Sequence, residues 1–233
     1  MAVNTLAFVF ARGGSKGIPG KNIVNLGGLP LIAHSIRLAL SHPLIDGVVV
    51  STDDPQIAEV ARAHGAEVPF MRPAELASDS APEWQAWQHA IRACRAQPQW
   101  REFHTFVSLP ATAPLRHADD VSACMARHAQ GDVDLVLTGS PAARSPYFNM
   151  VRSTDDNLVE LAVPGQFSRR QDAPELFDLT TVAYVASADF ILRASNIWQG
   201  RIGLVTVPRE RAIDIDEPLD LYLAECLYQR KTA

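Results

Sequence analysis

Cysteine is scarce in this sequence of 233 residues, which contains only Cys94, Cys124 and Cys226. Three widely separated thiols fit neither a disulfide framework nor the paired spacing of a zinc site. We therefore expect free thiols that pack as small apolar groups within helices, as is usual in a reducing compartment.

The sequence also lacks an excess of positive charge and any long apolar run. Lys and Arg total 21 against 26 Asp and Glu, and this balance excludes a general nucleic-acid-binding face. The apolar run Leu6–Ala11 is too short for a signal peptide, and no stretch approaches the roughly 20 apolar residues that cross a bilayer. We expect a cytoplasmic protein with no nucleic-acid or membrane partner, in which local cations hold any polyanionic ligand.

Strand patterns alternate with helical patterns along most of the chain. Leu6–Phe10 and Gly47–Ser51 are continuous apolar runs of the kind found in strands covered on both faces, and Asp54 can cap a following helix. A shorter strand is predicted at Glu67–Met71. Such alternation predicts one α/β domain over residues 1–233, with a three-layer, Rossmann-like, mostly parallel sheet and helices on both faces.

The alternation breaks between Pro141 and Gln171. Tyr147–Val151 and Leu158–Ala162 flank the polar turn Thr154–Asn157, which predicts an antiparallel hairpin. Exposed apolar hairpins commonly contact a partner. We therefore predict that residues 141–178 form a protruding insertion that serves as a homodimer contact.

A glycine-rich loop, Ala11–Asn22, directly follows the first predicted strand. It contains four glycines and three positive charges in twelve residues. Glycines allow successive backbone N–H groups to approach an anion, and the carboxyl end of a strand is where open α/β sheets bind ligands. The loop therefore predicts a cradle for a triphosphate. Its predicted phosphate contacts are Arg12, Gly13, Gly14, Ser15, Lys16 and Lys21.

Other glycine-rich motifs do not match this loop as well. A Walker loop needs Gly where Ser15 stands and a hydroxyl residue where Asn22 stands, and no dinucleotide fingerprint is present. Gly13–Gly17 does match the Gly-x-Ser-x-Gly nucleophile elbow, although Pro19 interrupts the helix that should follow. A serine hydrolase using Ser15, or a nucleotide-binding regulator without chemistry, therefore stays an alternative.

The loop resembles the N-terminal signature Ala-Arg-Gly-Gly-Ser-Lys-Gly-x-x-x-Lys-Asn of the acylneuraminate cytidylyltransferases (CMP-sialic acid synthetases). Arg72–Asp79 is similar to the family segment Arg-Pro-x-Glu-Leu-Ala-x-Asp, and Leu109–Arg116 is similar to Leu-Gln-Pro-Thr-Ser-Pro-Leu-Arg. The resemblance implies that the loop cations meet the phosphates of CTP. It also implies that Asn22, Arg72 and Thr112 lie at the nucleotide.

Ser168–Asp172 is similar to the sugar-binding Arg-Gln motif of this family. A 2-keto acid sugar presents a carboxylate beside its anomeric carbon, and a planar guanidinium holds a carboxylate through two hydrogen bonds. The resemblance implies sugar contacts at Arg170, Gln171 and Arg116, with Arg169 as a second choice for Arg170. It would make insertion 141–178 a sugar-binding element as well.

Asp214-Ile215-Asp216 follows the last predicted strand. In an extended segment alternate side chains point the same way, so two carboxylates share one face and attract a hard cation. Asp216 could also cap the final helix. The family has a similar Asp-Ile-Asp followed by Asp-Leu, as in Asp220-Leu221, and we predict Asp214 and Asp216 as Mg²⁺ ligands.

The family pattern is broken at three places in this chain. Pro82 and Glu83 stand where serines are common, Pro110 replaces a Gln implied to touch the sugar, and Thr180-Thr181 replaces Asn-Gly. The change at Pro82 and Glu83 affects the implied contact to the base or ribose, whereas Pro110 and Thr180-Thr181 indicate a sugar that differs from plain N-acetylneuraminate.

Together the motifs predict a cytidylyltransferase for polysaccharide biosynthesis. It would transfer CMP from CTP to the anomeric hydroxyl of sialic acid or a related nonulosonic acid and release pyrophosphate. Another acidic acceptor, such as Kdo or a phosphonate, is the alternative. Arg12, Lys21 and Asp216 are the predicted catalytic residues.

Overall fold

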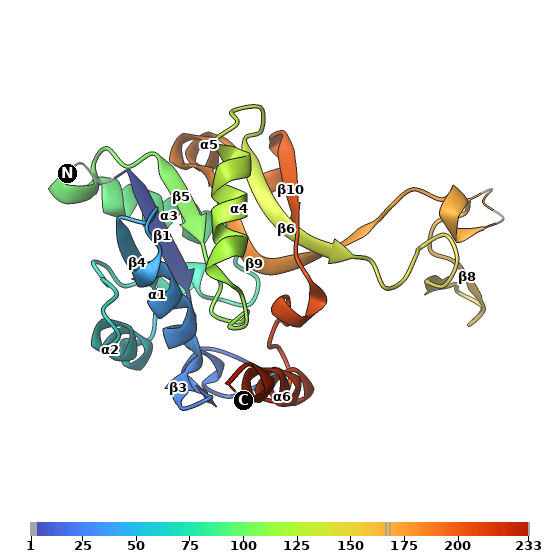
Figure 1. Cartoon of the computed structure of the whole chain (residues 1–233), viewed down its shortest axis with the longest axis horizontal. Coiled ribbons are helices and arrows are strands. Elements are labelled where there is room, and N and C mark those ends of the chain that lie inside the picture. The colour runs from blue at the N-terminus through green and yellow to red at the C-terminus, as the bar shows by residue number, and fades with distance from the viewer. Residues whose placement is uncertain (1–3, 166, 168, 233) are drawn as a thin grey trace.

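Six strands form the main sheet in the computed structural model, which describes residues 4–165, 167 and 169–232 (Figure 1). Their order is β10-β6-β9-β5-β1-β4. The pairs β1–β4, β1–β5 and β6–β10 are parallel, whereas β9 is antiparallel to both of its neighbours. The predicted mostly parallel α/β architecture is therefore confirmed. The strands span β1 Thr5–Phe10, β4 Gly47–Ser51, β5 Thr105–Ser108, β6 Leu135–Pro141, β9 Phe177–Ser187 and β10 Ile202–Thr206.

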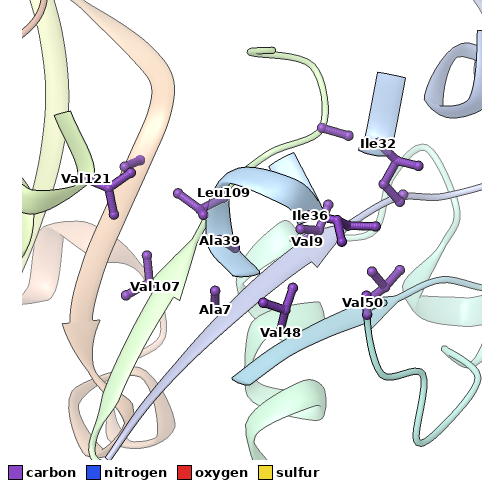
Figure 2. Packing of buried hydrophobic residues seen from close by; sticks show 14 of the residues in the cluster. Ala7, Val9, Ile32, Ile36, Ala39, Val48, Val50, Val107, Leu109 and Val121 are labelled. Carbon is purple, nitrogen blue, oxygen red and sulfur yellow. The ribbon is translucent and has the colours of Figure 1, made fainter. Parts of the chain in front are cut away.

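Helices cover both faces of this sheet because its strands are apolar on both sides. Ala7 and Val9 of β1 pack on one face and Leu6 and Phe8 pack on the other, all of them fully buried (Figure 2 shows the first face). The first face is covered by α1 Leu31–Ser41, α2 Pro55–Ala63 and α4 Ala118–His128, and the second by α3 Glu83–Arg95 and α5 Ala188–Arg193.

A third, smaller apolar cluster lies beside helix α6 (Pro218–Thr232). Ile18 of the glycine-rich loop packs there with Leu115, Ile215 and Ala224, so it joins the loop to the segment before α6. The short elements are β2 Asn25–Leu26, β3 Leu29–Pro30, η1 Lys21–Ile23, η2 Ala74–Leu76, η3 Pro98–Trp100, η4 Arg170–Asp172, η5 Ile197–Gln199 and η6 Arg209–Arg211.

Two sequence-based expectations were wrong. Glu67–Met71 is not a strand: Glu67 makes one isolated parallel bridge to Val49, and Pro69 has no N–H with which to continue the ladder. The thiols of Cys94 and Cys124 are buried, and burial raises the pKa of each to about 12. Cys226 was also expected to be packed as a small apolar group, and it is instead exposed on α6.

A long arm leaves the body of the molecule between β6 and β9 (Figure 1). Its tip is the antiparallel hairpin of β7 (Val151–Ser153) and β8 (Val159–Leu161), so the predicted hairpin is confirmed. The first strand starts later than predicted because Asn149 closes a turn on Ser145, with its N–H 3.0 Å from the Ser145 carbonyl oxygen. Every residue of the two hairpin strands is exposed.

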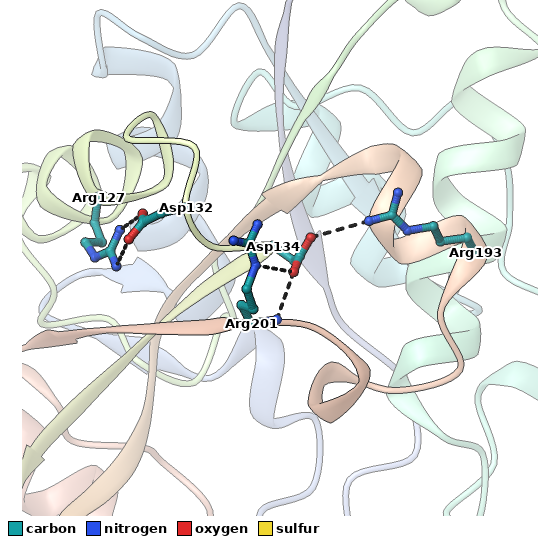
Figure 3. Close-up of polar contacts among 5 residues, drawn as sticks. All are labelled: Arg127, Asp132, Asp134, Arg193 and Arg201. Atoms are coloured by element: carbon teal, nitrogen blue, oxygen red, sulfur yellow. Dashed lines mark hydrogen bonds and ion pairs between the residues drawn. The ribbon is translucent and has the colours of Figure 1, made fainter.

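Ion pairs fasten the end of the sheet where β6 and β10 begin (Figure 3). Asp134 accepts hydrogen bonds from the backbone and side chain of Arg201 and pairs with Arg193, while Arg127 pairs with Asp132 at 2.5 Å. Ion pairs of this exposed kind contribute little to stability, because water screens the charges. None of the helices in the described residues combines the length and apolar character that a bilayer crossing requires.

Candidate active site

A cavity of about 320 Å³ opens beyond the carboxyl ends of β1 and β4. The ion pairs of Figure 3 lie at the other end of the strands, where β6 and β10 begin. The walls of the cavity come from the glycine-rich loop, from the segment between η2 and α3, and from the loop after β5. The structure thus brings together residues that the sequence analysis took from three separate motifs. Those lining the cavity are Arg12, Ser15, Lys21, Asn22, Arg72 and Thr112.

Hydrogen bonds from neighbouring segments hold the glycine-rich loop in place. The Asn22 side chain donates to the Arg12 carbonyl at 3.0 Å, and Asp53 Oδ1 accepts from the Gly13 N–H at 3.0 Å. Asp53 therefore holds the loop from the segment just after β4, and in this conformation it accepts the hydrogen bond of the Gly13 N–H. The Ser15 N–H likewise bonds to the Gly13 carbonyl, at 3.1 Å.

One carboxylate, that of Asp79, forms ion pairs with two of the loop cations. Asp79 lies 2.5 Å from Arg12 Nη1 and 2.5 Å from Lys16 Nζ. The hydrogen bonds from Lys16 and then Arg12 lower the pKa of this exposed carboxyl. The pairing shows that the loop presents a binding position for an anion. Lys16 itself is highly exposed, with 81% of its side chain accessible, and does not line the cavity.

The Asp214–Asp216 segment has no regular secondary structure and lies against the glycine-rich loop, with the Asp216 carbonyl oxygen next to Gly17. Ile215 is buried, and its N–H bonds to the Thr112 carbonyl at 2.8 Å. Asp216 Oδ1 is 2.7 Å from Lys21 Nζ, which joins the acidic segment to the loop. Asp216 does not cap α6, because Asp220 Oδ2 accepts from the backbone N–H groups of Asp216 and Glu217.

Asp214 fits a hard cation better than any other carboxylate here. Its Oδ1 is buried and has no hydrogen-bond partner in the described part of the chain, and a buried carboxylate oxygen without a donor is stabilised by a cation. Within the described residues no group of three or more His, Cys, Asp or Glu side chains gathers to hold a metal. An ion here would therefore take its other ligands from phosphates and water, as Mg²⁺ does.

Arg72 forms part of the cavity wall, and hydrogen bonds to Ser51 hold its guanidinium in place. It is buried, its Nε donates to Ser51 Oγ at 3.1 Å, and its Nη2 donates to the Ser51 carbonyl. Its guanidinium lies over the Phe10 ring, 5.6 Å from the centroid. Burial lowers the pKa of Arg72, and the nearby Asp53 and Glu83 oppose that shift.

The predicted sugar contacts do not line this cavity. Arg116 is buried, with Nη1 2.6 Å from Ser35 Oγ and Nη2 bonded to the Pro110 carbonyl. Burial lowers its pKa to about 9, with Asp214 acting in the opposite direction. Arg170 lies in η4 on the arm, where the position of its side chain is not described, and Gln171 is exposed beside it.

Several lining residues were missed as site candidates. Phe10 lies at the end of β1, and the others extend from the end of η2 to the start of α3: Leu76, Ser78, Asp79, Ala81, Glu83 and Ala86. The sequence carries one signal for the residues near α3. The chain departs from the family pattern at Pro82 and Glu83, directly after the matched segment Arg72–Asp79.

The surroundings of Ser15 do not form a nucleophile elbow. The chain after Ser15 continues as loop and turn until η1 begins at Lys21, so no helix follows the serine. No histidine is among the described residues that line the cavity. The structure therefore gives no support to hydrolase chemistry at Ser15.

Two glycines of the loop allow a sharp test of its fit against the acidic segment. A Cβ at Gly17 would lie 2.1 Å from the backbone carbonyl oxygen of Asp216, whereas a Cβ at Gly14 meets nothing within 4 Å. We expect Gly17→Ala to push the loop and the segment apart, with a loss of roughly 1–3 kcal/mol in the free energy of unfolding and a clear loss of nucleotide binding. Gly14→Ala keeps its N–H and should change neither. Thermal unfolding and calorimetric titration with CTP measure both effects, and equal behaviour of the two variants would contradict this description of the loop.

Comparison with known proteins agrees with this geometry. The family model described as Cytidylyltransferase matches residues 6–229. The chain is 35% identical to the CMP-N,N'-diacetyllegionaminic acid synthase of Campylobacter jejuni over 97% of this chain and 95% of that protein. It is 32% identical to a Campylobacter jejuni pseudaminic acid cytidylyltransferase, with 97% of each chain covered. A solved structure of CMP:2-keto-3-deoxy-manno-octonic acid synthetase complexed with CTP superposes with a TM-score of 0.70 at 17% identity, covering 98% of this chain and 99% of that one.

Proposed function

Since this chain belongs to the cytidylyltransferase family, we propose that it transfers CMP from CTP to the anomeric hydroxyl of a nonulosonic acid and releases pyrophosphate. The observation that carries the proposal is the packing of an acidic segment against two residues of the cavity wall. Residues 214–216 are not among the described residues that line the cavity, but Asp216 pairs with Lys21 and the Ile215 N–H bonds to the Thr112 carbonyl, and both Lys21 and Thr112 line it.

The residues of the cavity suit the charge changes of this reaction. As the sugar hydroxyl attacks the α-phosphate, negative charge builds up on the phosphate oxygens and on the departing pyrophosphate. Arg12 and Lys21 would neutralise that charge, and Ser15 would donate a hydrogen bond from the same loop. Asn22 and Thr112 would hold the loop and the nucleotide in position.

Asp214 and Asp216 would hold Mg²⁺ beside the phosphates. When bound, the ion neutralises phosphate charge and lowers the pKa of the attacking hydroxyl. The orphaned Asp214 oxygen supports this assignment. Asp216 would exchange its contact with Lys21 for the ion, which frees the Lys21 ammonium for a phosphate.

We also propose that residues 141–178 act as the homodimerisation and sugar-binding insertion of a single nucleotidyltransferase domain. Its hairpin exposes Val151, Leu158 and Val159, each more than half accessible, and apolar surface of this kind is typical of an interface. The arm, which includes Arg170 and Gln171 in η4, projects away from the main sheet of its own chain (Figure 1). A second copy would bring such an arm to a sugar bound in the first.

Disrupting the hairpin is expected to separate the copies. Val159→Asp places a charge in the apolar strand and should shift the protein from dimer to monomer in light scattering, because an unpaired charge is costly to bury at an interface. Asn157→Asp, at an exposed position of the hairpin turn, adds the same charge outside the apolar strands and should leave the mass unchanged. A monomeric wild-type protein would contradict the proposed dimer.

A pyrophosphate-release assay tests the reaction and the acceptor together. CTP, Mg²⁺ and one acid at a time are supplied, from sialic, legionaminic and pseudaminic acids to Kdo and a phosphonate. We expect release with at least one nonulosonic acid and loss of release on adding a chelator. No release with any acid would overturn the proposal, and chelator-insensitive ester cleavage that Ser15→Ala abolishes would favour a hydrolase instead.

A further inference from the structure

Glu83, the first residue of α3, faces the cavity at a place where the function described above gives it no role. It lines the cavity together with Arg72 and Phe10. A carboxylate at the start of a helix interacts favourably with the helix dipole, and Glu83 Oε1 also accepts from Trp87 Nε1 at 3.2 Å. These two roles occupy the helix side of the residue. Its second oxygen makes no hydrogen bond in the described structure.

Arg72 is placed as a donor in the same cavity. Ser51 holds its Nε and Nη2, so the guanidinium plane is fixed and Nη1 is left without a hydrogen bond in the described structure. Arg72 and Glu83 interact electrostatically, yet they form no ion pair within the described residues. The wall of one cavity of about 320 Å³ therefore carries a fixed donor, Arg72, and an acceptor, Glu83, each with an atom that makes no hydrogen bond in the described structure.

A cytosine ring matches such an arrangement. Its edge presents an exocyclic amino donor next to the ring N3 and O2 acceptors, and a carboxylate is the side chain that accepts from the amino group of cytosine. Uracil presents a carbonyl oxygen instead of that amino group, and a carboxylate repels it. We propose that Glu83 accepts a hydrogen bond from the exocyclic amino group of cytosine, opposite Arg72, and so makes the cavity selective for CTP over UTP.

This inference rests on the proposed use of CTP, and the rest of the cavity supports it. Phe10, Ala81 and Ala86 supply apolar surface for a base in the same cavity. Glu83 is exposed at the cavity wall, and its neighbourhood raises the pKa of its carboxyl through partial removal from water, which Trp87 and Arg72 oppose. A base bound in the cavity would cover this acceptor, and a covered acceptor gains from a matching donor and disfavours a ligand that lacks one.

The test is the nucleotide preference of Glu83→Gln. Glutamine keeps the size of the side chain and an acceptor for Trp87, but its amide can donate to the uracil oxygen. Calorimetric affinities for CTP, UTP and 2'-deoxy-CTP, and kcat/KM values for pyrophosphate release with one acid, are compared in wild type and variant. We expect the preference for CTP over UTP to fall at least about 10-fold, and the preference for CTP over 2'-deoxy-CTP to stay unchanged.

Two control variants distinguish recognition of the base by Glu83 from a loss of stability and from a change of net charge. Glu75→Gln makes the same charge change on η2, where the side chain is exposed and outside the cavity, and should leave the CTP preference unaltered. Glu83→Asp withdraws the carboxylate and should weaken CTP binding even if Glu83→Gln folds poorly. An unchanged ratio in folded Glu83→Gln, or a change only in the 2'-deoxy-CTP ratio, would overturn the proposal. Selective CTP binding without pyrophosphate release would contradict the proposed reaction alone.

Discussion

Replacing Lys21 with Ala is expected to lower kcat/KM for CTP by about 10²–10³-fold, as removal of one fixed donor from a transition-state site does elsewhere. The Lys21 side chain is only 13% accessible and lines the cavity. Its ammonium lies 2.7 Å from Asp216 Oδ1. The other lysine of the loop, Lys16, does not line the cavity and therefore does not replace it. Pyrophosphate release under subsaturating CTP measures the effect.

Lys16→Ala is the matched control for this prediction. Lys16 belongs to the same loop and carries the same charge, but its side chain is exposed, does not line the cavity and pairs with Asp79 on the cavity wall. We expect a loss below about 10-fold, as suits an exposed charge that water screens. Equal losses for the two variants would mean that the loop acts through its total charge, and near-normal turnover of Lys21→Ala would remove it from the catalytic residues.

The second large effect is expected from Asp214→Asn. The substitution keeps the shape of the side chain and replaces one carboxylate oxygen with an amide nitrogen, which cannot ligate a cation. We expect turnover at fixed Mg²⁺ to fall at least about 100-fold, because a bound ion contributes several kcal/mol of charge stabilisation. The Mg²⁺-dependent rise in melting temperature, measured with a non-hydrolysable CTP analogue, should also be lost.

Asp214→Asn has a structural effect that must be separated from ion binding. Asp214 offsets the buried charge of Arg116, so its neutralisation should lower the melting temperature without nucleotide as well. Asp134→Asn is a suitable control, since Asp134 pairs with Arg193 and Arg201 at the opposite end of the strands and does not line the cavity. Its variant should lose some stability and keep the Mg²⁺ response. An intact Mg²⁺ response in Asp214→Asn would exclude Asp214 as a ligand.

Local chemistry explains which parts of the site could be predicted. The charge and glycine content of loop 11–22 indicate an anion site before any contact is known. Alternation in an extended segment predicts that Ile215 turns inward while its acidic neighbours face the other way, and Ile215 is buried. Asp54 is read as a helix cap in the same way, and its Oδ1 accepts from the Gln56 N–H at 2.7 Å.

Long-range geometry explains what could not be predicted. Asp79 pairs with Arg12 across 67 positions of sequence, and nothing local to either residue indicates the other. Strand β9 is antiparallel, and a run buried on both faces carries no sign of its direction. Arg116 matches a family motif, yet the chain folds its guanidinium onto the Pro110 carbonyl inside the protein.

The arm begins and ends at neighbouring points of the sheet. Pro141, at the end of β6, is the registered partner of Phe177, at the start of β9. Closing a loop whose ends are already adjacent depends only weakly on its length, so residues between these two points can be shortened, lengthened or exchanged while the sheet and its cavity stay intact. Grafting the arm of a relative onto this chain should therefore yield a folded protein. Under the proposed sugar-binding role of the arm, acceptor choice and nucleotide choice could then diverge separately during evolution.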